Sequence, residues 1–130
     1  MMTNKSNVEV QKEIALDFLQ LVIAGSIDEA FEDYVNMHGK HHNVHFSAEF
    51  ESLKKGMVEN FTQFPNKRIM VKNVLGDFHL VAVHSNIVMI PGEPGIAAVH
   101  IFRFEAGKIV EMWDIAQSIP FDSPNRLGAF

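Results

Sequence analysis

One imidazole and one carboxylate form the pair of side chains in this sequence best suited to chemistry. His100 and Asp114 lie in the stretch IAAVHIFRFEAGKIVEMWDIAQ, residues 96–117, which alternates apolar and other residues and breaks once at Ala106-Gly107. This pattern predicts two antiparallel strands joined by a tight turn, with opposing residue numbers that sum to about 213 or 214. His100 should therefore face the region of Asp114 in the middle of an apolar sheet, where polar groups are costly unless they are paired or used.

A carboxylate and an imidazole in this arrangement are a candidate general acid/base pair. An apolar surrounding disfavours the charged form of a carboxylate, and an adjacent imidazole can orient it or share its proton. The other interpretation is that Asp114 is a solvated residue near a strand end and His100 a hydrogen-bonded core histidine. A pair on two strands is not by itself a motif specific to one reaction.

Four more residues on the predicted strands are candidates for contact with a substrate. His84 and Asn86 share a face of the strand predicted over residues 78–90, where they could hydrogen-bond a carbonyl or hydroxyl group in the same cavity as His100. Phe102 and Met112 belong to an aromatic and sulfur-rich patch at strand spacing. Such side chains can line a substrate cavity, although core packing or a contact between two sheets is their more common use.

A cluster of histidines is the candidate metal site. The segment NMHGKHHNVHF, residues 36–46, contains His38, His41, His42 and His45. Neutral imidazoles bind zinc, iron or nickel, and the first, third and fourth of these would align on a helix. Gly39 and the strand-favouring HNVHF argue against a helix, and no nearby carboxylate completes a ligand set. We therefore expect no metal and no cofactor, and a loop with one short strand near residues 41–44.

Helix-period patterns fill most of the first half of the chain, and strand-period patterns fill the second. We expect helices over residues 7–24, 26–34 and 49–64. We expect strands over residues 68–75 and 78–90, separated by a turn at Gly76-Asp77 and followed by the hairpin. This order predicts an α+β fold with three helices on one face of a strongly curved, four-stranded antiparallel sheet, and a cone-shaped cavity for a small ligand between the layers.

Composition restricts the class of protein further. With 130 residues, 47% hydrophobic and 21% charged, the chain should form a single domain, residues 1–130, that needs no crosslink. Zero cysteines exclude a disulfide framework, a thiol nucleophile and a Cys-ligated zinc. A net charge of −5 with scattered basic residues argues against nucleic acid or an anionic membrane as a partner. No export signal or membrane span is recognisable, so we expect a soluble cytoplasmic protein.

Several runs of residues resemble one known family. AAVHIFRFEAGKIVEMWDIAQSIP resembles the ending of SnoaL-like proteins in the nuclear-transport-factor-2-like superfamily, and VAVHSNI and HNVHF are similar to other segments of that family. The resemblance covers nearly the whole chain and implies a cone-shaped α+β fold and a dimer. The best-characterised relatives are polyketide cyclases, which close a ring by intramolecular aldol condensation without metal or organic cofactor, using an Asp with a His nearby.

The resemblance also implies roles for individual residues. Asp114 and His100 fit the family's catalytic Asp and His, so Asp114 would remove a proton α to the carbonyl of a small hydrophobic substrate. Four residues match pocket-lining positions of the family: His42, Asn43, His45 and His84.

Other functions remain compatible with the same fold. One is a non-catalytic ligand-binding or dimerisation module, and another is a cofactor-free isomerase or hydrolase that uses the same residues. The face that carries Glu111, Trp113 and Ile115 looks exposed, and we expect a homodimer formed through this convex side of the sheet.

Overall fold

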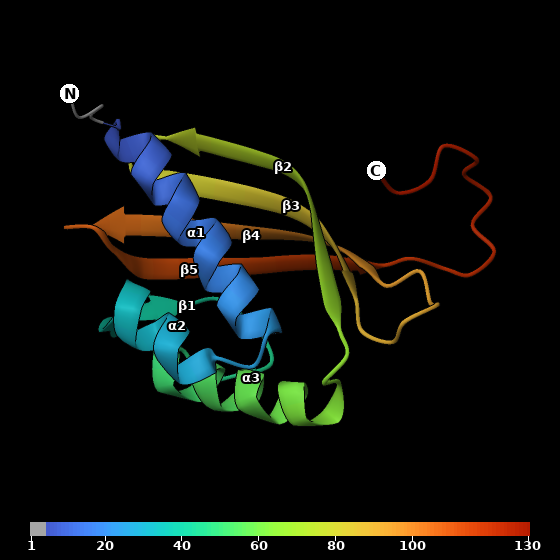
Figure 1. Ribbon diagram of the computed structural model, residues 1–130, viewed down its shortest axis with the longest axis horizontal. Coiled ribbons are helices and arrows are strands. Elements are labelled where there is room, and N and C mark those ends of the chain that lie inside the picture. The colour runs from blue at the N-terminus through green and yellow to red at the C-terminus, as the bar shows by residue number, and fades with distance from the viewer. Residues whose placement is uncertain (1–4) are drawn as a thin grey trace.

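The computed structural model of this protein describes residues 5–130 and has three helices packed on one face of a curved five-stranded sheet (Figure 1). The helices are α1 (Asn7–Ile23), α2 (Ile27–Tyr34) and α3 (Phe50–Gln63). The strands are β1 (Val35–His41), β2 (Arg68–Asp77), β3 (Leu80–Val88), β4 (Ile96–Glu105) and β5 (Lys108–Ser118). The predicted α+β fold, with three helices on a curved sheet, is confirmed.

The sheet has one strand more than predicted. Its order is β1-β5-β4-β3-β2. Strands β2 to β5 form the expected antiparallel meander, whereas β1 pairs with β5 in parallel. The prediction of a purely antiparallel, four-stranded sheet was therefore wrong. The short strand predicted near residues 41–44 was also misplaced, because β1 ends at His41 and a loop follows it.

Gly39 explains why β1 was not recognised. A glycine among polar residues usually indicates a loop, but in this protein Gly39 lies within a strand. A Cβ atom on Gly39 would lie 2.2 Å from the carbonyl oxygen of Val110 in β5 and 2.8 Å from the Phe50 ring. The glycine is needed because two strands approach each other closely at this point.

The hairpin of β4 and β5 has the predicted register. Ala106 and Gly107 form its turn with φ values of 49° and 78°, and His100 lies directly opposite Asp114. The pairing shifts by one residue between Arg103 and Phe104, which marks a β-bulge. The register of the central hairpin therefore confirms the expected pairing of the two candidate catalytic residues.

The bulge changes which residues of β5 enter the core. Strict alternation places Ile109 on the face opposite Met112, but both side chains are fully buried in the core. Because Phe104 pairs with Ile109 while Arg103 pairs with Glu111, Val110 is the extra residue of the bulge. Ile109 therefore lies in the core, although strict alternation would turn it outward.

The turn between β2 and β3 lies two residues later than predicted. Asp77 pairs with Leu80, so that Phe78 and His79 form the turn, with Phe78 at a φ of 49°. Gly76 is part of β2, and a Cβ atom there would lie 2.8 Å from a side-chain carbon of Val8 in α1. Gly76 thus allows α1 to pack closely on the strand.

An aromatic core joins the helices to the sheet. The Phe18 ring of α1 makes edge-to-face contacts with Phe31 of α2 and Phe102 of β4, at centroid distances of 5.4 and 5.8 Å. Phe31 in turn contacts Phe50 of α3 at 6.2 Å. Helix α1 presents Phe18 inward because its buried apolar residues recur at helical spacing: Ala15, Phe18, Leu19 and Val22.

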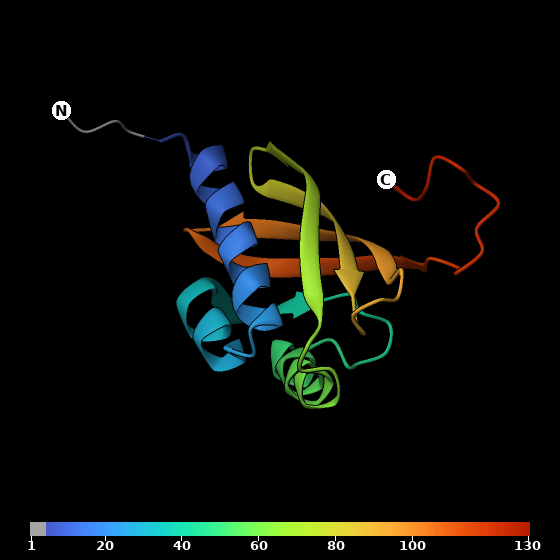
Figure 2. The ribbon, with the colours of Figure 1, turned by 45° about the vertical axis from the view of Figure 1, so that its right-hand side comes forward.

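The sheet is strongly twisted, and the chain leaves it at one end. Figure 2 shows β2 rotated relative to β5, so that the sheet curls around the helices. Residues 119–130, all of which the structure describes, have no helix or strand and extend beyond the sheet (Figures 1 and 2). No helix of residues 5–130 has the length and apolar character required to cross a membrane.

We predict that Phe18→Ala lowers the free energy of unfolding by about 3–5 kcal/mol, because it leaves a cavity where three elements meet. Phe121→Ala is the matched control, since Phe121 lies in the tail with 80% of its surface exposed. Its effect should stay within about 0.5 kcal/mol. Urea unfolding of both variants measures the difference, and equal effects would contradict the assignment of Phe18 as the junction of the core.

Candidate functional site

The candidate site is centred on His100 and Asp114. The hairpin register places them as direct cross-strand partners. Nε2 of His100 lies 3.7 Å from Oδ1 of Asp114, which is too long for a hydrogen bond. Their side chains are only 14% and 20% exposed. The two groups therefore face each other in a largely enclosed site without a direct bond between them.

Asn43 holds the other oxygen of the carboxylate. Its Nδ2 donates to Oδ2 of Asp114 at 2.9 Å, and its Oδ1 accepts from the backbone N–H of His45 at 3.0 Å. The amide is thus oriented at both ends. Because Oδ2 is occupied, Oδ1 is the oxygen of Asp114 that is free to accept a proton.

His41 braces the loop that carries Asn43. Its ring is buried, and its Nε2 donates to the carbonyl oxygen of Ser47 at 2.6 Å. Its Nδ1 accepts from the backbone N–H of Asn43 at 3.1 Å. These partners require a neutral ring that carries its hydrogen on Nε2. His41, at the end of β1, thus has a structural function that the sequence did not reveal.

Several buried polar side-chain atoms of strands β3, β4 and β5 have no hydrogen-bond partner within the described chain. They are Oδ1 of Asp114, Nδ1 of His100, Oγ of Ser85 and Oδ1 of Asn86. Buried polar groups are usually paired, because an unpaired one retains its full cost of desolvation. The unpaired atoms of Asp114 and His100 therefore keep an unused capacity for hydrogen bonding.

Burial also determines the charge state of His100. Desolvation lowers the pKa of His100 below its ordinary value, and the nearby Asp114 carboxylate opposes this effect only in part. The imidazole is therefore neutral at neutral pH. A neutral ring can donate one hydrogen bond and accept another.

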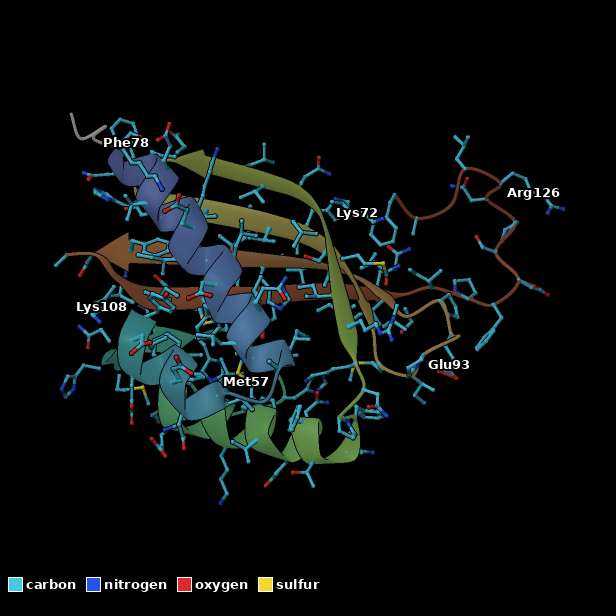
Figure 3. All side chains as sticks on the ribbon, in the orientation of Figure 1. Met57, Lys72, Phe78, Glu93, Lys108 and Arg126 are labelled. Carbon is cyan, nitrogen blue, oxygen red and sulfur yellow. The ribbon has the colours of Figure 1, made fainter. Side chains whose placement is uncertain are left out.

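A cavity of about 280 Å³ opens beside this pair. It lies between the sheet and the helices α1 and α3, and Met57 projects from α3 toward the C-terminal end of α1 in Figure 3. Most of its lining is apolar, including Leu19, Val22, Met57, Ile87 and Ala98. Its polar lining residues are Asn43, Asn60, Lys67, His100 and Asp114. An apolar cavity with a few convergent polar groups is typical of a small-molecule site.

His84 and Asn86 do not reach this cavity, contrary to prediction. In β3 the side chains of Val83 and Ser85 are buried on the helix side, and Val83 is the residue that pairs with His100. His84 and Asn86 consequently point outward, where His84 contacts Asn73 and Asn86 donates to the carbonyl oxygen of Pro94. The phase of β3 was misjudged because its two faces carry similar numbers of apolar residues.

Phe102 and Met112 lie beneath the site and do not line it. Both are almost completely buried in the core, with exposed fractions of 0% and 1%. The ring of Phe102 stacks against His100 with a centroid distance of 6.4 Å. The ring of Phe102 thus supports the orientation of the imidazole, and neither Phe102 nor Met112 belongs to the cavity lining.

His42 belongs to a separate cluster on the outer side of the sheet. Its Nε2 lies 2.6 Å from Oε2 of Glu111, and its ring stacks on Trp113 at 5.1 Å. Arg103 also donates to Glu111 at 2.8 Å. His42 and Arg103 both hold the pKa of Glu111 below its usual value. Glu111 is therefore paired and mostly buried, although its face was expected to be exposed.

The histidine cluster is dispersed in the structure. His41 is buried at the end of β1, His42 contacts Glu111, and His38 and His45 are not buried. Within residues 5–130, no group of three or more histidine, aspartate or glutamate side chains is arranged to hold a metal ion.

Two polar residues of the cavity, Asn60 and Lys67, were missed from the sequence. Asn60 lies in the last turn of α3, and Lys67 follows the helix-ending sequence Phe64-Pro65-Asn66. A lysine that follows a helix is usually exposed to solvent. Lys67 lines the cavity because the turn formed by residues 64–67 folds the chain back. The backbone N–H of Lys67 donates to the carbonyl of Phe64 at 3.3 Å in this turn.

Comparison with known proteins identifies the fold. No family model matches the chain, and no curated protein has a matching sequence. A SnoaL-like polyketide cyclase from Agrobacterium tumefaciens is similar in structure, with a TM-score of 0.67 and 18% identity over 82% of this chain and 91% of the other. A SnoaL-like protein of unknown function from Burkholderia thailandensis has a TM-score of 0.70 and 12% identity over 85% and 96% of the two chains.

A third structure extends the likeness to the wider superfamily. A nuclear-transport-factor-2-like protein of unknown function from Cytophaga hutchinsonii has a TM-score of 0.67 and 15% identity, over 90% of this chain and 95% of the other. At these identities the likeness concerns the fold and leaves the chemistry open. The chain thus has the fold of the SnoaL-like proteins within the nuclear-transport-factor-2-like superfamily, as its sequence resemblance implied.

Proposed function

We propose that this protein binds a small hydrophobic carbonyl compound and acts on it as a cofactor-free acid/base catalyst, in the manner of an aldol-type cyclase. The observation that carries the proposal is the state of Asp114. One carboxylate oxygen is held by Asn43, and the other is buried beside the neutral His100 in an apolar cavity, without a hydrogen-bond partner among residues 5–130. A base needs such a free oxygen within reach of the substrate.

The reaction begins with proton removal from carbon. Asp114 Oδ1 takes a proton from the carbon α to the substrate carbonyl, and the electron pair moves to the carbonyl oxygen as an enolate. His100 donates a hydrogen bond to that oxygen, which stabilises the developing charge where water is largely excluded. The carboxylate is thereby converted to a carboxylic acid.

The ring closes in the second step. The enolate carbon attacks another carbonyl carbon of the same molecule, forming a carbon–carbon bond and an alkoxide. Asp114 returns its proton to the alkoxide, so that the protein ends in its starting state. The cavity contributes by holding the two reacting carbons together, since a positioned intramolecular reaction avoids much of the entropic cost.

A ligand-binding module without chemistry is the second candidate. It is favoured by the predominantly apolar lining of the cavity, because such a lining binds a hydrophobic molecule whether or not Asp114 acts as a base. The two candidates differ in one respect. Catalysis requires the carboxylate of Asp114, whereas binding alone does not.

We also propose a homodimer formed through the outer face of the sheet. The pairing register places a row of apolar side chains on this face, which none of the three helices in the described chain covers: Ala82, Val99, Ile101, Trp113 and Ile115. Ile115 is 58% exposed. A second copy of this chain presents the same apolar face, and pairing two such faces removes both from water.

Asp114→Asn should reduce turnover by about two to four orders of magnitude, because it removes the proton acceptor but almost no volume. Initial rates with a poly-β-ketone probe measure the effect. Asp77→Asn is the matched control, because Asp77 is exposed at the end of β2. Full turnover by a folded Asp114→Asn protein would favour the ligand-binding candidate.

His100→Gln should remove part of the pH dependence of stability. Because the folded pKa of His100 lies below its unfolded value, the unfolded chain binds more protons as the pH falls through about 6.5. Wild type should therefore lose stability relative to the variant in that range, by at most about 1.4 kcal/mol per pH unit. Urea unfolding between neutral and mildly acidic pH measures this, and parallel curves for the two proteins would contradict a neutral, buried His100.

Ile101→Glu should convert the dimer to a folded monomer, because it places a charge in the centre of the proposed interface. Sedimentation velocity at micromolar concentration measures the oligomeric state, and circular dichroism verifies the fold. Val58→Glu is the control, since Val58 is exposed on α3 in the opposite layer. A wild-type protein that sediments as a monomer would refute the dimer.

A further inference from the structure

Lys67 is a buried lysine at the edge of the cavity. It lies between α3 and β2, lines the cavity and is only 8% exposed. Lysine is almost never buried to this extent unless an acidic group pairs with it. The mechanism proposed above does not use this residue.

The ammonium group of Lys67 has no acidic partner in the structure. None of the salt bridges found among residues 5–130 includes it. Its Nζ donates to Oδ1 of Asn60. An ammonium group has three donors, and this bond uses one of them. The burial of Lys67 is therefore only partly compensated.

Asn60 brings a second polar side chain to the same edge of the cavity. A lysine cannot accept a hydrogen bond, so the amide oxygen of Asn60 must face Nζ and its Nδ2 group must point elsewhere. Asn60 also lines the cavity. Lys67 and Asn60 thus place an ammonium group and an amide together at one edge of an apolar cavity.

Without a ligand, the positive charge of the Lys67 ammonium group is poorly stabilised. Burial lowers the pKa of Lys67. An anion in contact with Nζ would reverse that shift and replace the hydration that the ammonium group has lost.

The cavity has a second polar region, which carries the carboxylate of Asp114 in place of an ammonium group. Asp114 lies on β5, whereas Lys67 directly precedes β2, and strands β4 and β3 separate the two along the sheet. Three strand spacings of about 4.8 Å, shortened by curvature, lie between them. The carboxylate of Asp114 repels an anion, so a ligand with one anionic end is oriented with that end toward Lys67.

We propose that Lys67 and Asn60 bind the carboxylate group of an acidic, hydrophobic ligand whose other end reaches His100 and Asp114. This inference rests on the proposed function, because it takes the cavity as the ligand site and narrows its substrate class to carbonyl compounds that carry a carboxylate. The apolar walls between the two polar regions contact the hydrocarbon part of the ligand.

Calorimetric titration with octanoate and octan-1-ol tests the proposal, since the two probes differ mainly in the carboxylate. Wild type should bind octanoate at least tenfold more tightly than octan-1-ol. Lys67→Met should abolish this preference by weakening octanoate binding while leaving octan-1-ol binding nearly unchanged. Lys55→Met, which removes the same charge from an exposed position on α3, should retain the preference.

A second measurement uses the wild-type protein alone. At a pH high enough to leave part of Lys67 neutral, octanoate binding should be accompanied by proton uptake, because burial lowers the pKa of Lys67 and a bound anion raises it. The uptake is seen as a dependence of the binding enthalpy on the ionisation heat of the buffer. Equal affinity for the two probes, no binding of either, or equal losses in Lys67→Met and Lys55→Met would overturn the proposal. These binding results are independent of turnover, so failure here is distinguishable from failure of Asp114 as a base.

Discussion

The pairing register of β4 and β5 is the constraint on which the rest of this structure depends. It places His100 opposite Asp114 and Phe102 opposite Met112 on the face that the helices cover. The bulge at Val110 then allows β5 to turn Ile109 into the core as well. A shift of one residue would exchange the two faces, so that His100 and Asp114 would point to solvent.

The aromatic core and the cavity have opposite effects on the stability of the fold. At one end, Phe18, Phe31 and Phe102 fill the space between the helices and the sheet and supply stability. At the other end, the cavity contains polar groups such as Asp114 and Lys67 whose burial is incompletely compensated. Such groups reduce stability, and a ligand that pairs with them recovers that free energy as affinity.

The sequence predicted the parts of this protein that depend on local periodicity. The three helices agree with prediction to within one residue at each end, and the hairpin register is as expected. The missed features depend on tertiary contacts. Gly39 lies in a strand only because β5 passes close to it, and the outward phase of His84 depends on which face of β3 the helices cover. Lys67 enters the cavity only because a turn folds it back.

In the proposed function, Asp114 removes a proton from the carbon beside a carbonyl group. Proton nuclear magnetic resonance in D₂O tests this directly, with a bicyclic ketone such as 1-tetralone as the probe. We expect catalytic amounts of the wild-type protein to replace the α-protons of the ketone with deuterium much faster than buffer alone. Exchange at the rate of buffer, with the ketone shown to occupy the cavity, would contradict it.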